Sequence, residues 1–380
     1  MDFTGKRATL IGLGTRTHVS LARFLVSRGA EVTISDVKPA EKLEEEIRLL
    51  GDLPVRMSLG GHRDEDVVSA DVVFVTPGAS RDLPCLVATS ERGIPIRSEI
   101  ELLFHLCESP IVAITGSSGK TTTTTLTGEI LKAQGRRVFV GGNIGMPLID
   151  RLDEIGLDSV VVLELSSFQL EHMTDSPHVA AILNVTPNHL DRHVTMENYA
   201  NAKKNIILYQ KPDDYAILGV DDPIAGSLWP ECRGNRLGFS LEREVESGGF
   251  LWSDELLLRY GGREELVCRT GDVKLRGRHN LYNVLAAAAI SAAAGADTDS
   301  IRQVVTTFTG VEHRLELVRE IRGARYYNDS IATAPERTLA ALNAYDEPIV
   351  LIFGGKSKHL PMEKLIEKVN EKVRALVLMS

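Results

Sequence analysis

One stretch of the chain, residues 111–121, constrains the fold more than any other. The apolar run Ile-Val-Ala-Ile-Thr leads directly into Gly-Ser-Ser-Gly-Lys-Thr. A buried strand followed by such a glycine turn is typical of a strand–loop–helix unit whose backbone N–H groups converge on phosphate oxygens. In that loop Lys120 would neutralise the β and γ phosphates, and the Thr121 hydroxyl would bind Mg²⁺. The full pattern has glycine at position 114, where this chain has Ile, so an ordinary strand-to-helix turn stays an alternative.

Composition narrows the class of protein. The length of 380 residues allows about two to four domains. A net charge of −9 with scattered Lys and Arg argues against a general nucleic-acid binder. The four cysteines include no C-x-x-C pair, so neither a zinc ribbon nor a disulfide framework is indicated, and we expect a reducing cytoplasm. No apolar run reaches the ~18 residues of a membrane span.

The N-terminal part of the chain alternates β-branched strands with helical patterns. Strands are predicted over residues 7–11, 32–35 and 72–76, and a helix over 21–27. This order predicts a parallel Rossmann-like sheet. Gly12-Leu13-Gly14 after the first strand and Asp36 after the second resemble a dinucleotide fingerprint, but Thr17 occupies its third glycine position. An NAD site, a nucleotide-sugar diphosphate site at the same helix N-terminus and a plain βα turn all stay open.

A second αβ unit begins at the phosphate loop. Its later strands are predicted over residues 137–140, 160–165 and 179–185, a core helix over 285–296, and shorter pieces of a peripheral sheet over 234–270. Ligands of open α/β sheets gather beyond the carboxyl ends of the strands, so polar residues there are site candidates. Glu164 ends one strand, and with Thr121 it would supply the oxygen ligands that Mg²⁺ needs. His189 follows another strand and is a second candidate ligand.

A third unit starts near Gly310. Strands are predicted over residues 324–328, 349–353 and 375–379, the last of them buried, and helices over 334–343 and 362–373. This unit has about half the usual ~100 to 150 residues of a domain. We therefore expect an incomplete third domain with exposed apolar surface.

Several segments, in order along the chain, resemble the Mur ligase family. They are Gly116–Thr121, Gly141–Gly145, Glu164–Glu171, Asn184–Thr186 with His189–Arg192, Gly277–Asn280 and Asn328–Ser330. The resemblance implies an α/β protein of three domains. These are a Rossmann-like UDP-sugar-binding domain over 1–98, a central P-loop ATPase-like domain over 99–309 that binds ATP and Mg²⁺, and an incomplete Rossmann-like C-terminal domain for the amino acid over 310–380.

The same resemblance implies an activity and a set of partners. The expected enzyme is an ATP-dependent amide ligase that adds D-glutamate to UDP-N-acetylmuramoyl-L-alanine through an acyl phosphate, in peptidoglycan precursor synthesis. Its partners would be ATP, this UDP-sugar and D-glutamate, without nucleic acid or membrane. A cytoplasmic monomer is expected.

Site residues are implied by matching motif. The catalytic residues would be Lys120, Glu164, His189 and Lys203, with Lys203 carbamylated by CO₂. Thr121, Glu164, His189 and Lys203 would bind metal. Gly116, Ser117, Ser118, Gly119, Lys120, Thr121, Thr122, Asn280, Asn283, Arg314 and Asp329 would bind the nucleotide. Thr15, Arg16, Asp36, Asn143, Ser166, Gln169, Thr333 and Lys358 would bind the other substrates.

Other functions stay open. A sister Mur ligase or a folylpolyglutamate-type synthetase would share most of these segments. The short third unit leaves a non-catalytic nucleotide-sugar-binding module open, although intact Lys120, Glu164, His189 and Lys203 argue against it. An NAD oxidoreductase would leave Lys120 without a role.

Overall fold

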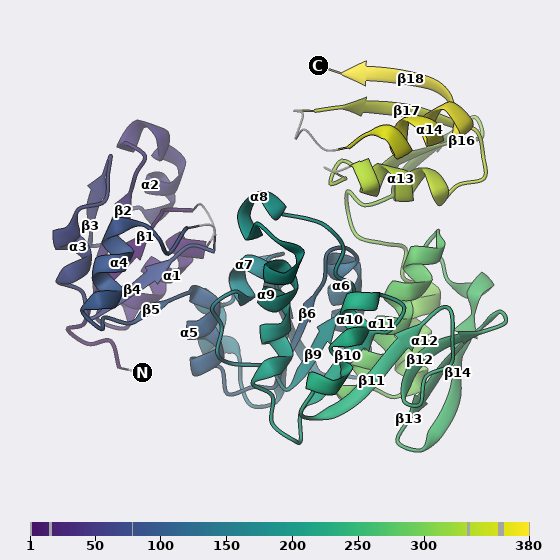
Figure 1. Ribbon diagram of the computed structural model, residues 1–380, viewed down its shortest axis with the longest axis horizontal. Helices are drawn as coiled ribbons and strands as arrows, with labels where there is room; N and C mark the ends of the chain where they lie inside the picture. Colours follow the sequence, from purple (N-terminus) through teal and green to yellow (C-terminus); the bar gives the residue numbers. More distant parts are fainter. Residues whose placement is uncertain (1, 15–16, 78, 333–334, 356–360, 380) are drawn as a thin grey trace.

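The computed structural model describes residues 2–14, 17–77, 79–332, 335–355 and 361–379. Three units follow one another along the chain, as Figure 1 shows, with the central unit between the other two. None of the described helices has the length and hydropathy that crossing a lipid bilayer requires.

The first unit is a five-stranded sheet of order β3-β2-β1-β4-β5. Its strands are β1 (Arg7–Ile11), β2 (Glu31–Asp36), β3 (Val55–Leu59), β4 (Val72–Val75) and β5 (Ile96–Arg97), and its helices are α1 (Thr17–Ser27), α2 (Glu44–Leu50), α3 (Asp64–Val68) and α4 (Pro84–Glu91). All four strand pairs are parallel, which confirms the predicted Rossmann-like sheet. Helix α1 begins earlier than predicted, at Thr17. Helix α5 (Glu99–Leu106) then leads into the central unit.

The central unit is a nine-stranded sheet of order β14-β13-β12-β11-β10-β9-β6-β8-β7. Its strands are β6 (Ile111–Thr115), β7 (Arg137–Gly142), β8 (Ser159–Glu164), β9 (Val179–Ile182), β10 (Tyr215–Gly219), β11 (Asn235–Ser240), β12 (Gly248–Trp252), β13 (Glu255–Tyr260) and β14 (Arg263–Arg269). The segment 234–270 is therefore not a separate peripheral sheet. Strand β11 pairs in parallel with β10, and the two final antiparallel pairs extend the same sheet.

Helices cover both faces of the central sheet. They are α6 (Lys120–Ala133), α7 (Ser167–Leu170), α8 (Leu190–His193), α9 (Met196–Leu208), α10 (Pro223–Ser227), α11 (Arg278–Ala293) and α12 (Thr298–Thr307). Strands β6, β8 and β9 are buried along their whole length, because helices lie on both sides of them. One core contains Leu126 of α6 and Ile301 of α12, and the opposite core contains Leu170 of α7 and Ile206 of α9.

Helix α11 contains the predicted core helix up to Ala293, and every residue from Asn283 to Ala293 is buried. Residues 286–289 are all alanines with no exposed surface. Small side chains allow the backbones to approach closely: a Cβ built on Gly249 of β12 would lie 2.8 Å from the carbonyl oxygen of Leu285. The alanine run is thus explained by packing.

The third unit contains two small sheets. Strands β15 (Glu316–Ile321) and β16 (Ala324–Asn328) pair antiparallel, and β17 (Ile349–Gly354) and β18 (Val373–Met379) pair in parallel. Helices α13 (Pro335–Asn343) and α14 (Glu363–Lys372) contact each other, and α14 contacts strand β18 of the second sheet. The expectation that β18 is buried is wrong: Leu378 is 70% exposed and Ile352 of β17 is 60% exposed. Among the described residues no further layer covers these side chains, and the expected exposed apolar surface is present.

Candidate active site

The phosphate loop lies between β6 and α6. Gly119 is the residue before the helix and has φ 83°, which favours glycine. The side-chain oxygen of Asn184, just beyond β9, accepts hydrogen bonds from the backbone N–H groups of Ser117 (3.1 Å) and Ser118 (2.9 Å). Lys120, Thr121 and Thr122 form the first turn of α6, where N–H groups have no partner within the helix. These groups and the helix dipole make the turn suitable for an anion.

Lys120 folds back over the loop. Its Nζ donates to the carbonyl oxygens of Gly116 (2.9 Å) and Ser117 (3.3 Å). Burial lowers the pKa of Lys120, Glu164 opposes that change, and the cations Arg337 and Arg314 add to it. Lys120 of α6 is therefore within electrostatic range of two cations of the third unit, Arg314 and Arg337. A triphosphate bound at the loop would bring negative charge to these three side chains.

Thr121 connects the loop to β8 and to the third unit. Its hydroxyl donates to Glu164 Oε2 at 2.7 Å and accepts from Arg314 Nη2 at 3.2 Å. Asn143 Nδ2 donates to Glu164 Oε1 at 3.0 Å. Glu164 is 2% exposed, and it meets Thr121 as the sequence predicted. The described residues contain no group of three or more His, Cys, Asp or Glu side chains that could hold a metal alone. A carboxylate with a threonine hydroxyl nevertheless fits Mg²⁺, which keeps water and phosphate oxygens as its other ligands.

Lys203 of α9 is buried beneath the phosphate loop. Its Nζ donates to the Gly116 carbonyl at 3.0 Å and to Thr115 Oγ1 at 3.4 Å, and it lies 4.6 Å from the centre of the Tyr199 ring. Burial lowers its pKa well below the ordinary value, and Lys120 contributes to the same change. Burial therefore shifts Lys203 toward the neutral amine, relative to an exposed lysine.

His189 directly precedes the short helix α8 and has a left-handed backbone, at φ 54°. Burial lowers its pKa, and Lys120 and Lys203 act in the same direction, against Asp191. The structure thus brings His189 within electrostatic range of the two lysines predicted with it.

The expected nucleotide contacts come from α11 and the third unit. Asn283 lies against the loop, since a Cβ on Gly119 would be 2.3 Å from its Oδ1. Asn283 also donates to Asn280 Oδ1 at 3.0 Å. Asp329 accepts from the Leu315 N–H at 3.1 Å, and burial raises the pKa of its carboxyl group. Arg314 reaches the central unit at Thr121, whereas the hydrogen bond of Asp329 lies within the third unit.

The residues expected to bind substrates other than the nucleotide lie in several parts of the chain. Asp36 lies at the first βα turn, where its carboxylate accepts from the N–H groups of Leu13 (2.6 Å) and Lys38 (2.8 Å). Ser166 and Gln169 cap α7, each side chain bonded to the other's backbone N–H. Thr15, Arg16, Thr333 and Lys358 lie outside the described residues.

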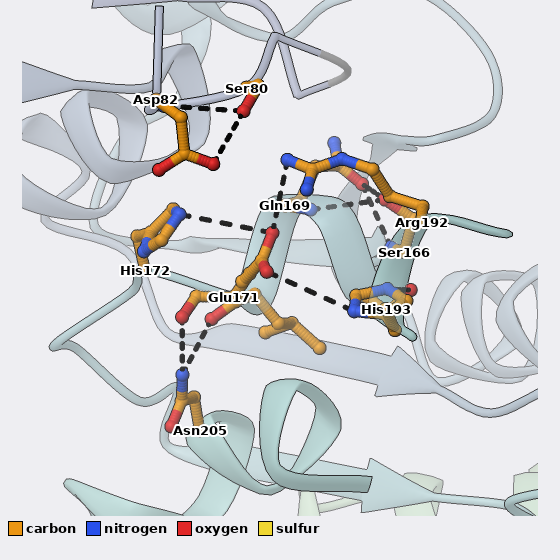
Figure 2. Close-up of polar contacts among 11 residues, drawn as sticks. Ser80, Asp82, Ser166, Gln169, Glu171, His172, Arg192, His193 and Asn205 are labelled. Atoms are coloured by element: carbon orange, nitrogen blue, oxygen red, sulfur yellow. Dashed lines mark hydrogen bonds and ion pairs between the residues drawn. The ribbon is translucent and has the colours of Figure 1, made fainter. Parts of the chain in front are cut away.

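A charged cluster around Glu171 was not predicted as a site. Figure 2 shows Arg192, His193 and His172 pointing toward this carboxylate, with Ser80 and Asp82 of the first unit opposite. Its oxygens lie 3.7 Å from Arg192 Nη2, 4.0 Å from His193 Nδ1 and 3.9 Å from His172 Nε2. Glu171 belongs to a segment that resembles the Mur ligases. The sequence analysis also did not name Arg337, which lies within electrostatic range of Lys120. No sequence signal marks Arg337.

Comparison with known proteins gives consistent matches. Residues 6–98 match the family described as Mur ligase MurD-like, N-terminal domain, and residues 114–291 match the Mur ligase middle domain. The UDP-N-acetylmuramoylalanine–D-glutamate ligase of Symbiobacterium thermophilum is 46% identical over 98% of this chain and 82% of its own length. The enzyme of the same name from Acetivibrio thermocellus is 43% identical, over 98% of this chain and 80% of its own length.

Solved structures share the fold at lower identity. The UDP-N-acetylmuramate-alanine ligase MurC of Thermotoga maritima aligns with a TM-score of 0.60 at 20% identity, over 98% of this chain and 85% of that one. A pseudomurein peptide ligase type C from Methanothermus fervidus aligns with a TM-score of 0.55 at 21% identity, over 99% of this chain and 89% of that one.

Proposed function

The chain belongs to the Mur ligase family, and we propose that the site between β6, β8, α9 and the third unit carries out its ligation chemistry. The reaction is the ATP-dependent addition of D-glutamate to UDP-N-acetylmuramoyl-L-alanine in peptidoglycan precursor synthesis. The observation that carries the assignment is the identity of 46% over 98% of the chain.

The reaction needs ATP because a carboxylate oxygen is a poor leaving group. The terminal carboxylate of the alanyl arm attacks the γ-phosphorus, ADP leaves, and an acyl phosphate forms. The amine of D-glutamate then attacks the acyl carbon, phosphate leaves, and the amide remains. Positioning and charge neutralisation supply most of the acceleration in such transfers.

The residues of the site fit these two steps. Lys120, Arg314 and Arg337 counter the charge of the transferring phosphoryl group, and the first turn of α6 holds the phosphates. Thr121 and Glu164 would hold Mg²⁺, with His189 as a further ligand. Bound Mg²⁺ draws negative charge from the phosphoryl oxygens.

We infer carbamylation of Lys203 from its burial. A neutral amine is the form that reacts with CO₂, forming an N–C bond and releasing a proton. The depressed pKa of Lys203 supports that form. The product would place an anionic oxygen beside Lys120 in place of the buried amine, and a magnesium site accepts such an oxygen.

The division of work follows the three units. We propose that residues 1–98 bind the UDP-sugar, residues 99–309 bind ATP and metal, and residues 310–380 contribute to amino-acid binding. A monomer in the cytoplasm is part of the same proposal. Asp36, at the first βα turn, would accept hydrogen bonds from the nucleoside. The sugar and its alanyl arm would be contacted by Asn143, Ser166 and Gln169.

The test is a product assay. The protein is incubated with ATP, Mg²⁺, UDP-N-acetylmuramoyl-L-alanine and one amino acid at a time, and the ligated product is measured by mass. We expect product with D-glutamate only, and phosphate release that requires both acceptor substrates. Preferred ligation of another amino acid, or rapid ATP hydrolysis without the UDP-sugar, would contradict the proposal.

A further inference from the structure

A series of ring contacts runs from His189 to the phosphate loop. The Phe168 ring lies edge-on to His189 with centroids 5.0 Å apart, and it stacks on His193 at 5.2 Å with an interplanar angle of 7°. His193 next contacts the Tyr199 ring at 5.3 Å. The Tyr199 hydroxyl is 3.0 Å from Ser117 Oγ in the loop. Helices α7, α8 and α9 are therefore joined through the buried ring of His193.

His193 is fixed by polar contacts as well. Its Nε2 is 2.9 Å from Ser167 Oγ, and its carbonyl oxygen accepts from Asn198 Nδ2 at 3.0 Å. Its side chain is 1% exposed, and its other ring nitrogen faces Glu171 at 4.0 Å (Figure 2). Glu171 is itself held, because Asn205 Nδ2 donates to its carbonyl oxygen at 3.1 Å. The ring therefore has one orientation set by α7 and α9.

The turn that His193 closes has an unusual backbone. Helix α8 is four residues long and lies between His189, at φ 54°, and Val194, at φ 66°. Left-handed backbone is rare for residues other than glycine, and rarest for a β-branched one such as valine. Conformations of this kind persist where surrounding contacts determine them. The ring contacts of Phe168 and His193 are among the contacts at this turn, together with the ion pair of Arg192 and Glu171.

We propose that His193 is a positioning residue for the ligation: stacked on Phe168, it holds the α8 turn so that His189 presents its ring to the metal site. This inference rests on the proposed function of that site. His193 has no exposed path to a substrate, so its effect passes through His189. Residues that orient a metal ligand in this way are commonly worth about 10- to 100-fold in metal affinity or activity.

The experiment measures metal binding separately from turnover. Mn²⁺ binding is followed by electron paramagnetic resonance with the full chain and a non-hydrolysable ATP analogue. The variants are His193→Ala, Phe168→Leu and the ring-preserving His193→Phe, with His189→Ala as the reference for loss of the ligand itself. The matched control is His178→Ala, since His178 also contacts a tyrosine ring, Tyr215, but pairs with Asp214 away from the loop.

We expect the Mn²⁺ dissociation constant to rise about tenfold in His193→Ala and in Phe168→Leu. The Mg²⁺ concentration for half-maximal turnover should rise with it, while KM for the UDP-sugar stays within about twofold. His193→Phe keeps the stack and should recover most of the binding. His178→Ala should match the wild type.

Two results would overturn the inference. One is Mn²⁺ binding in Phe168→Leu equal to that of the wild type, which decides the matter even if His193→Ala does not fold. The other is a loss in His193→Phe as large as in His193→Ala. If Mn²⁺ binding depends on His193 as expected but the wild-type chain ligates no amino acid, the proposed function is contradicted and the positioning role is still supported.

Discussion

The first βα turns of the two large units are each closed by a side chain at or just beyond the end of a neighbouring strand, and these side chains differ in charge. In the first unit, the turn after β1 is closed by the Asp36 carboxylate, which accepts from the Leu13 N–H. In the central unit, the turn after β6 is closed by a neutral side chain, Asn184, and is covered by Lys120. A carboxylate accepts hydrogen bonds from N–H and hydroxyl groups, whereas an ammonium group binds phosphate. We therefore expect the two strand–turn–helix units to bind different ligands, because the side chains that close their turns differ in charge.

The largest expected effect comes from removing the cation of the central turn. Lys120→Ala should lower kcat roughly 10²- to 10³-fold, because a preorganised charge on the transferring phosphoryl group is lost. Steady-state kinetics with both substrates saturating measures this. Lys132→Ala, on the exposed side of the same helix and paired with Glu129, is the control. Equal turnover in Lys120→Ala and Lys132→Ala would show that the two turns do not differ in chemistry.

The next effect concerns the lysine beneath that turn. Lys203→Ala should lower kcat by about 10- to 100-fold while ATP still binds, because the metal site loses an oxygen ligand. Short carboxylic acids added to the assay should restore part of the activity by filling the vacated space. Lys204→Ala is the matched control, since Lys204 is the adjacent lysine and pairs with Glu231 at 2.9 Å. Wild-type turnover of Lys203→Ala at limiting Mg²⁺ would rule out the carbamate.

A smaller effect is expected at the first turn. Asp36→Asn keeps the size of the side chain but removes one of the two oxygens that accept backbone N–H groups. Hydrogen bonds to charged groups contribute about 1.5 to 3 kcal/mol, so KM for the UDP-sugar should rise about tenfold or more with kcat nearly unchanged. Substrate titration distinguishes the two parameters, with Asp52→Asn as a surface control. A fall in kcat alone would place Asp36 in the central chemistry.

The smallest expected effect is on the free energy of unfolding. It concerns Glu99, in helix α5 between the first unit and the central unit. Burial raises the pKa of Glu99 to about 7 from its ordinary 4.5, Asp150 adds to the change, and the Ile149 N–H opposes it. Between these values the folded chain binds more protons than the unfolded chain, so the free energy of unfolding falls as pH rises from 4.5 to 7. Glu99→Gln should remove this loss, which is at most about 3 kcal/mol.

The measurement is thermal unfolding at pH 5 and pH 8. We expect Glu99→Gln to unfold at a higher temperature than the wild type at pH 8 and at a similar temperature at pH 5. Glu108→Gln, an exposed residue beyond the same helix, should change neither. A variant that is stabilised equally at both pH values would mean that the charge of Glu99 is not the cause.

The sequence predicts best where one local pattern decides the outcome. Strand β6 with its glycine turn, and Glu164 at the end of β8, were found because apolar runs and their polar ends are read directly along the chain. The edge of the central sheet was not predicted, because no local pattern indicates whether β11 pairs with β10 or starts a new sheet. The choice between Lys203 and Lys204 also required the fold: one faces β6 and the other faces Glu231. Arg337 comes close enough to lower the pKa of Lys120 only because the fold places α13 there.

Helix α11 has a consequence for how proteins of this architecture adapt to heat. Its alanines have no exposed surface, and Gly249 approaches the Leu285 carbonyl so closely that a methyl group would not fit. Larger side chains in this part of the core would strain the packing. Added thermal stability must therefore arise at the surface, for example in ion-pair networks such as that of Arg259 with Glu244 and Glu264. Thermophilic and mesophilic relatives should then differ least in α11 and most at such edges.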